Sequence, residues 1–149
     1  MPPATAANRV AHCVGGRLTF VVIFDYNLID DRAPMIPQTR PISWIKAVRK
    51  DFEKFPVEAQ SICLTALTVA AEGGKADIAK PMLGLGSGVM EIALSLRGNA
   101  FRVVYAVQIG RDLWVIHAFQ KKSTHGIRTP KHEIDLIADR LRKLKEMLQ

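Results

Sequence analysis

Three consecutive stretches in the second half of the chain alternate in hydrophobicity with a period of two. They cover residues 89–96, 100–109 and 113–119, and they are rich in β-branched and aromatic residues. Such segments predict β-strands. The links at Gly98-Asn99 and at 110–112 suit hairpins and are too short for a parallel crossover. The sequence therefore predicts three antiparallel strands that are neighbours in one sheet.

Two helical patterns precede these strands. Between residues 45 and 55, four apolar side chains recur at a spacing of three or four, which marks the buried face of a helix. Pro56 ends this helix and suits the first turn of a second one. The second apolar stripe runs over residues 59–70, and Gly73-Gly74 ends it. We expect a helical hairpin.

A third helical pattern closes the chain. Thr129 is the predicted N-cap and Pro130 the predicted first helical residue. Apolar residues from 134 to 148 form one stripe, and Arg142, Lys143 and Lys145 lie opposite. The predicted fold class is a small α+β domain: an antiparallel sheet, an N-terminal helical hairpin and a C-terminal amphipathic helix.

The first 34 residues do not fit this pattern. Residues 1–17 are rich in Ala, Pro and Gly, show no period, and predict a disordered leader. Residues 18–26 favour a strand, and the segment 30–34 breaks it. Either translation starts near Met35, or 18–26 is a genuine extra strand. The predicted organisation is a leader, 1–34, and one domain, 35–149.

Charge narrows the class of partner. The 149 residues carry a net charge of +7, and residues 97–145 hold eleven Lys and Arg against four acidic residues. A basic half of this kind favours nucleic acid or an acidic protein. The longest apolar run, 18–24, is too short for a membrane span. Cys13 and Cys63 form no disulfide framework, so we expect a cytoplasmic protein without a membrane partner.

Common catalytic and cofactor motifs are missing. Residues 84–88 (Gly-Leu-Gly-Ser-Gly) resemble a phosphate loop, but a strand follows where such loops need a helix. The four histidines lack the spacing of a metal site, and no Ser–His–Asp arrangement is evident. Glu91 is the one acid within the three strands. We therefore expect no metal and no cofactor.

Arg102 stands in the middle of an otherwise apolar strand, where an unpaired charge is expensive to bury. It meets a carboxylate, for which Glu91 is the candidate, or it faces a wet groove that binds anions. Both interpretations are open.

A second group of cations surrounds the start of the last helix. Positive charge there opposes the helix dipole, which favours a bound anion, although a solvated run of charge has the same composition. The basic residues and histidines of this segment are His117, Lys121, Lys122, His125, Arg128, Lys131 and His132.

An ordered set of motifs carries a resemblance. It comprises Lys80-Pro81, the 84–88 loop, the segments 89–92, 101–105 and 117–123, and Thr129-Pro130-Lys131, together with the Phe55-Pro56 junction. Over about residues 41–148, the chain resembles the phage-related HigB-type branch of the RelE/ParE toxin superfamily. The resemblance implies a RelE-like α+β fold and a toxin of a type II toxin–antitoxin pair, with a helix-turn-helix antitoxin as partner.

The resemblance also implies a chemistry. Relatives of this type cleave mRNA in the ribosomal A site without a metal, through attack of the RNA's own 2′-hydroxyl on the adjacent phosphate. Cations stabilise the transition state, and other groups move the protons. The implied catalytic residues are Arg102, Lys121 and Lys122. The implied RNA contacts are Lys80, His117, His125, Arg128, Lys131 and His132, whereas Tyr105 is expected in the core.

The chain departs from the RelE pattern at two places. Glu91 and Ala93 stand on a strand where that branch carries basic residues, and residues 131–149 contain no tyrosine. Two alternatives therefore remain: a ParE-like inhibitor of a protein such as gyrase, which would depend on the helical hairpin 45–72, and an inactive nucleic-acid-binding relative.

Overall fold

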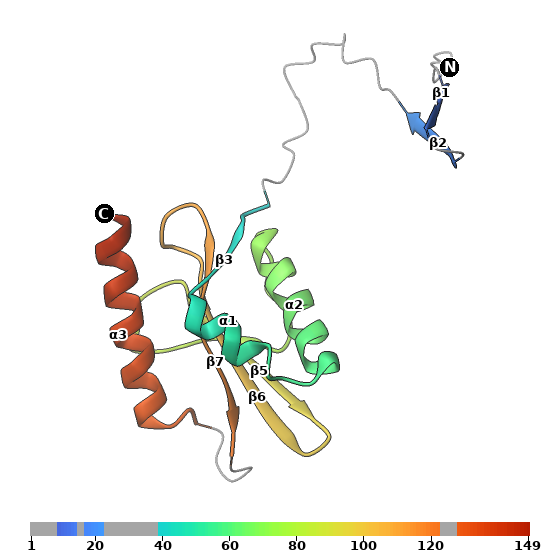
Figure 1. Ribbon diagram of the computed structural model, residues 1–149. Helices are drawn as coiled ribbons and strands as arrows, with labels where there is room; N and C mark the ends of the chain where they lie inside the picture. Colours follow the sequence, from blue (N-terminus) through green and yellow to red (C-terminus); the bar gives the residue numbers. More distant parts are fainter. Residues whose placement is uncertain (1–8, 15–16, 23–38, 123–127) are drawn as a thin grey trace, which may run out of the picture. The chain divides into compact units, whose positions relative to one another are not determined.

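The computed structural model describes residues 9–14, 17–22, 39–122 and 128–149, and the chain divides into two units, Met1–Ile36 and Pro37–Gln149 (Figure 1). In the first unit, β1 (Arg9–Val14) pairs antiparallel with β2 (Arg17–Val22). The expectation that residues 1–17 lack regular structure is therefore wrong for Arg9–Val14 and for Arg17. The sequence does hold a hairpin signal there, because Gly15-Gly16 separates two strand-like runs. Residues 23–26 and Met35 lie outside the described residues.

The second unit is built on a five-stranded sheet. Its strand order is β3-β7-β6-β5-β4, and β3 is parallel to β7 while the other pairs are antiparallel. The strands are β3 (Ile42–Trp44), β4 (Ala79–Pro81), β5 (Val89–Leu96), β6 (Asn99–Ala106) and β7 (Leu113–Lys121). The three predicted strands are confirmed as neighbours. However, β6 ends three residues before the predicted boundary and β7 runs two residues beyond it.

Three helices within the described residues cover both faces of this sheet. They are α1 (Lys46–Phe52), α2 (Val57–Ala71) and α3 (Lys131–Leu148). The predicted fold class, an antiparallel-based α+β domain with a helical hairpin and a C-terminal amphipathic helix, is confirmed. Among the described residues, none of the helices combines the length and the apolar character needed to cross a membrane.

The two faces hold separate apolar cores because side chains alternate along each strand. Phe101, Val103 and Tyr105 of β6 pack with α1 and α2, whereas Val104 and Ala106 pack with α3. Figure 1 shows α2 and α3 on opposite sides of the sheet. Tyr105 is almost fully buried, as expected for a core residue. The packing of α3 rests on its apolar stripe, Ile137, Leu141 and Leu144, all buried.

Candidate functional site

Three polar side chains are buried within the part of the chain that the structure describes: Glu91, Arg102 and His117. They come from the adjacent strands β5, β6 and β7. The register aligns Glu91 with Val104 and Val104 with His117, and Arg102 precedes Val104 by two residues. All three therefore point to the α3 face of the sheet.

A β-bulge helps to bring His117 to this face. Val104 pairs with His117 and Tyr105 with Val115, so Ile116 has no partner on β6. Ile116 packs into the α3 core, and the alternation of β7 restarts at His117. Without the extra residue, His117 would face α1 and α2.

Glu91 is the centre of the first polar cluster. Its Oε1 lies 3.4 Å from Lys80 Nζ and 3.7 Å from Arg102 Nε, and its Oε2 accepts a hydrogen bond from the Thr129 hydroxyl. Arg102 also donates to the carbonyl of Phe101 at 3.1 Å. The interpretation that Arg102 meets a carboxylate, with Glu91 as its partner, is therefore confirmed.

Thr129 plays a different part from the one predicted. The N-cap of α3 is Pro130, and no side chain caps this helix end. The Thr129 hydroxyl is instead committed to Glu91 on β5, a residue 38 positions away in the sequence. An N-cap hydroxyl accepts a hydrogen bond from a backbone N–H of the first turn, whereas the Thr129 hydroxyl donates its hydrogen to the buried Glu91 carboxylate. Hydrogen bonds to a charged acceptor are the stronger ones, which favours this long-range bond over a local cap.

His117 is the centre of the second polar cluster. Its Nδ1 lies 2.6 Å from Arg140 Nη1, and its Nε2 lies 2.5 Å from Glu133 Oε2. A guanidinium only donates, so Nδ1 is the acceptor and Nε2 carries the hydrogen that is donated to Glu133. Burial lowers the pKa of His117 below its usual 6.5, against the opposing effect of the bond to Glu133. The geometry and the burial both favour this neutral tautomer.

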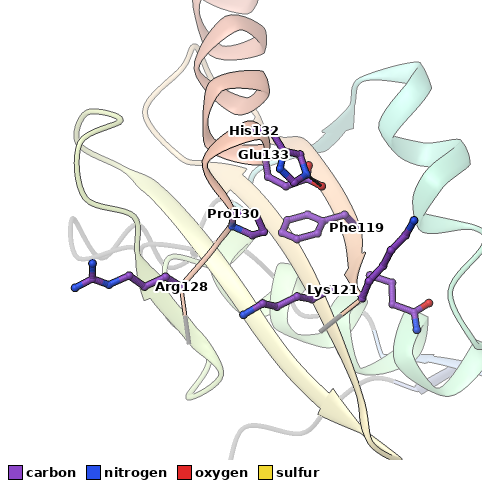
Figure 2. A pocket seen from close by; sticks show the side chains of 8 residues that line it. Phe119, Lys121, Arg128, Pro130, His132 and Glu133 are labelled. Atoms are coloured by element: carbon purple, nitrogen blue, oxygen red, sulfur yellow. Dashed lines mark ion pairs between the residues drawn. The ribbon is translucent and has the colours of Figure 1, made fainter. Parts of the chain in front are cut away.

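A pocket of about 530 Å³ opens beside this cluster, where β7 ends and α3 begins (Figure 2). Its described lining residues are Phe119, Gln120, Lys121, Lys122, Arg128, Pro130, His132 and Glu133. Figure 2 shows the Phe119 ring beside Pro130, with Glu133 and His132 next to the ring and Arg128 extending outward. The Phe119 ring also stacks on the His117 ring, with 5.2 Å between the ring centroids. The pocket therefore combines an aromatic surface with cations.

A smaller pocket of about 330 Å³ adjoins the first. It shares Phe119, Gln120 and Glu133 with the first. Its other lining residues are Asp51, Lys54, Phe55, His117 and Ala118. Glu133 therefore lines both pockets, and His117 lines the smaller one.

The predicted site residues divide into groups in the structure. Lys121, Lys122, Arg128 and His132 line the large pocket, whereas Arg102 and Lys80 belong to the Glu91 cluster. His117 is buried with both ring nitrogens engaged. Lys131 is exposed as the first residue of α3 and is not among the lining residues, and His125 lies outside the described residues.

Four described residues of the pocket were not predicted as site residues: Phe119, Gln120, Pro130 and Glu133. The sequence contains a signal for Glu133, because this acid directly follows the basic residues Lys131 and His132. Phe119 shares a strand face with His117, but only the bulge fixes which face this is.

The other sequence candidates can be placed briefly. The described residues contain no group of three or more His, Cys, Asp or Glu side chains arranged to hold a metal ion. The loop 84–88 leads into β5 and not into a helix, and its three glycines have positive φ angles, as turns commonly do. Cys63 is a buried core residue of α2, as predicted.

One known protein family matches the chain. A family described as phage derived protein Gp49-like (DUF891) matches residues 50–142, which is more than half of the chain. The chain belongs to the Gp49-like family. The match runs from α1 into α3 and so includes both polar clusters and the pocket. The Gp49-like family is related to the toxins of toxin–antitoxin systems. Searches of curated proteins and of solved structures found no significant match.

Proposed function

We propose that this Gp49-like protein is the toxin of a type II toxin–antitoxin pair, of the HigB type, and that it is a ribosome-dependent mRNA endonuclease working without a metal. The observation that carries the proposal is the pocket at the start of α3, which joins the Phe119 ring to the cations Lys121, Lys122 and Arg128. Proteins bind single-stranded nucleic acid by stacking bases on aromatic rings beside a positively charged groove. The volume of about 530 Å³ lies within the usual range of ligand pockets, about 300–1,000 Å³.

The proposed chemistry follows from what this pocket offers. The 2′-hydroxyl of the bound nucleotide attacks the adjacent phosphate and displaces the 5′-oxygen of the next nucleotide. Lys121, Lys122 and Arg128 supply the positive charge that stabilises the phosphorane as negative charge develops on it. The substrate contains its own nucleophile, so the protein needs to orient the RNA, stabilise charge and move protons.

The same charge suggests the remaining partners. A helix-turn-helix antitoxin with an acidic segment would cover the pocket and neutralise the toxin in the cytoplasm. The site of action would be mRNA in the ribosomal A site.

A second candidate function, ParE-like inhibition of a protein such as gyrase, is favoured by a different surface. Val57 and Leu64 of α2 are 83% and 41% exposed and line a shallow groove of about 470 Å³. Exposed apolar side chains along a groove favour contact with a protein. An inactive nucleic-acid-binding relative would keep the pocket but lack cleavage.

The test is induced expression in bacteria with mapping of mRNA 5′ ends. Arg102→Ala alone is a poor probe, because it also leaves buried Glu91 short of a cation. The double variant Lys122→Ala/Arg128→Ala removes two exposed charges of the pocket. The matched control is Lys75→Ala/Arg111→Ala, which removes one exposed Lys and one exposed Arg outside the lining residues.

The proposal expects growth arrest with new mRNA ends within coding regions. Both should be lost in the pocket variant and kept in the control. Growth arrest with intact mRNA would overturn the nuclease proposal and favour the α2 surface, which Leu64→Ser would then test. New mRNA ends that persist in the pocket variant would show that the pocket is not the RNA site.

A further inference from the structure

Glu133 is out of place in its surroundings. Among the described residues that line the large pocket, it is the one carboxylate, and the others are basic, aromatic or neutral. Its side chain is 18% exposed, so it is mostly enclosed but still reaches the pocket surface. A carboxylate in a site built for phosphate repels the substrate, so its presence needs an explanation other than binding.

The carboxylate is held in place from two sides. His117 donates its Nε2–H to Oε2, and His132 Nε2 lies 3.2 Å from Oε1. The bond from Arg140 fixes the tautomer of His117, and Arg140 also donates to the carbonyl of Ile116 at 3.2 Å. Each carboxylate oxygen has two lone pairs, so each still has room for one more hydrogen bond. A chain from Arg140 through His117 therefore orients Glu133 and leaves it able to accept a proton.

We propose that Glu133 is the general base of the reaction, with His117 and Arg140 as positioning residues; this rests on the proposed nuclease function. A Glu133 oxygen takes the proton of the substrate 2′-hydroxyl as the bond from O2′ to phosphorus forms. The bond from phosphorus to O5′ then breaks, and the departing oxygen takes a proton from water. The products are a 2′,3′-cyclic phosphate and a 5′-hydroxyl, and Glu133 returns its proton to solvent.

Other groups fit this role less well. Glu91 is about 1% exposed, its oxygens are engaged by Lys80, Arg102 and Thr129, and it is not among the described residues that line the pocket. Both ring nitrogens of His117 are already engaged. Lysine and arginine side chains carry their protons at neutral pH and so suit charge stabilisation better than proton removal.

The experiment compares full-length wild type with Glu133→Gln in a translating extract that contains a reporter mRNA. Glutamine keeps the size of the side chain and an acceptor oxygen for His117, but it cannot take up the proton. Asp135→Asn is the matched control, because Asp135 is an exposed acid two residues further along α3 and outside the lining residues. Glu133→Asp keeps a carboxylate on a shorter arm. Binding of a mixed-sequence single-stranded RNA, followed by anisotropy, is measured for every variant.

Loss of a positioned general base costs about 100- to 10,000-fold in rate. We expect Glu133→Gln to lose cleavage by that factor while it binds RNA as tightly as wild type or more tightly, since a repelling charge is gone. Glu133→Asp should retain part of the activity, and Asp135→Asn all of it.

The outcomes separate this inference from the proposed function. Cleavage by wild type with an unchanged rate in Glu133→Gln would overturn the role of Glu133 and leave the nuclease standing. Equal loss of cleavage and of RNA binding in Glu133→Gln would also overturn it, because the residue would then shape the pocket. Wild type that binds RNA and never cleaves it in the extract would refute both.

Discussion

The Glu91–Arg102 pair leads to a prediction about stability: Arg102→Met should destabilise the wild-type protein and stabilise the Glu91→Gln variant. At a separation of 3.7 Å and an effective dielectric constant of about 20, the attraction between two unit charges is about 4 kcal/mol. Glu91→Gln removes the charge that faces Arg102, whose side chain is 10% exposed and keeps the bond to the Phe101 carbonyl. A buried charge left without its partner costs about 3–5 kcal/mol.

Removing the other partner should cost less. Arg102→Met leaves Glu91 with Lys80 and the Thr129 hydroxyl, and methionine fills much of the space of the arginine stem. We expect about 1–2 kcal/mol, reduced from the usual cost of breaking a buried pair because the carboxylate remains compensated. In the Glu91→Gln background, Arg102→Met should instead stabilise the protein, since it removes the uncompensated charge.

Urea denaturation followed by tryptophan fluorescence measures all four proteins of this cycle. Both tryptophans, Trp44 and Trp114, belong to the unit Pro37–Gln149, so the signal reports the unit that contains the pair. The reasoning fails if Arg102→Met costs as much as Glu91→Gln, or if the two free-energy changes simply add in the double variant.

Three further predictions concern burial. The pKa of His117 is lowered in the folded protein, so the unfolded chain binds more protons below about pH 6.5. The contribution of neutral His117 to stability is therefore fully present above about pH 6.5 and is lost as the pH falls below it. Urea denaturation at pH values from about 7.5 to 5 should show a smaller loss of stability in His117→Gln than in wild type. Leu144→Ala should cost about 2–5 kcal/mol in urea denaturation, whereas Leu136→Ala, at a position that is 40% exposed, should cost less than half as much. Burial raises the pKa of Cys63 to about 11, so in Cys13→Ser protein a thiol reagent at pH 8 should modify Cys63 only in urea; rapid modification of the folded protein would contradict its burial.

Sequence patterns predicted those elements whose signal is local. The period of two in 89–96 matches β5 at both ends, and the stripe of the last helix matches its buried residues Ile137, Leu141 and Leu144. Each of these elements buries one face, so the pattern and the packing carry the same information.

Elements that depend on distant partners were not predicted in the same way. β4 has three residues and ends in Pro81, and β3 is a strand only because Leu113–Val115 of β7 lies beside it. Thr129 has the local signature of an N-cap, but a buried carboxylate 38 residues away takes its hydroxyl. The bulge at Ile116 shifts the facing of β7 by one residue, and it decides that His117 and Phe119 join the site.

The position of Glu133 on α3 gives a test of whether the His117–Glu133 pair serves catalysis or the stability of the fold. Glu133, Ile137, Leu141 and Leu144 follow the spacing of four, four and three residues, so they lie on one face of the helix. Glu133 therefore occupies the first position of the apolar stripe, where it meets His117 instead of an apolar residue. A buried polar pair of this kind can often be replaced by apolar residues at no cost or with a gain of about 1–4 kcal/mol.

We therefore expect His117→Leu/Glu133→Leu to be as stable as wild type or more stable in urea, and to be inactive in mRNA cleavage. Arg140 keeps its bond to the carbonyl of Ile116 in this variant, so the exchange leaves it with an acceptor. If the free energy of unfolding of this double variant were more than about 2 kcal/mol below that of wild type, the pair would be shown to stabilise the fold. It would remove the argument that the protein keeps a polar pair at the head of its apolar stripe for chemistry.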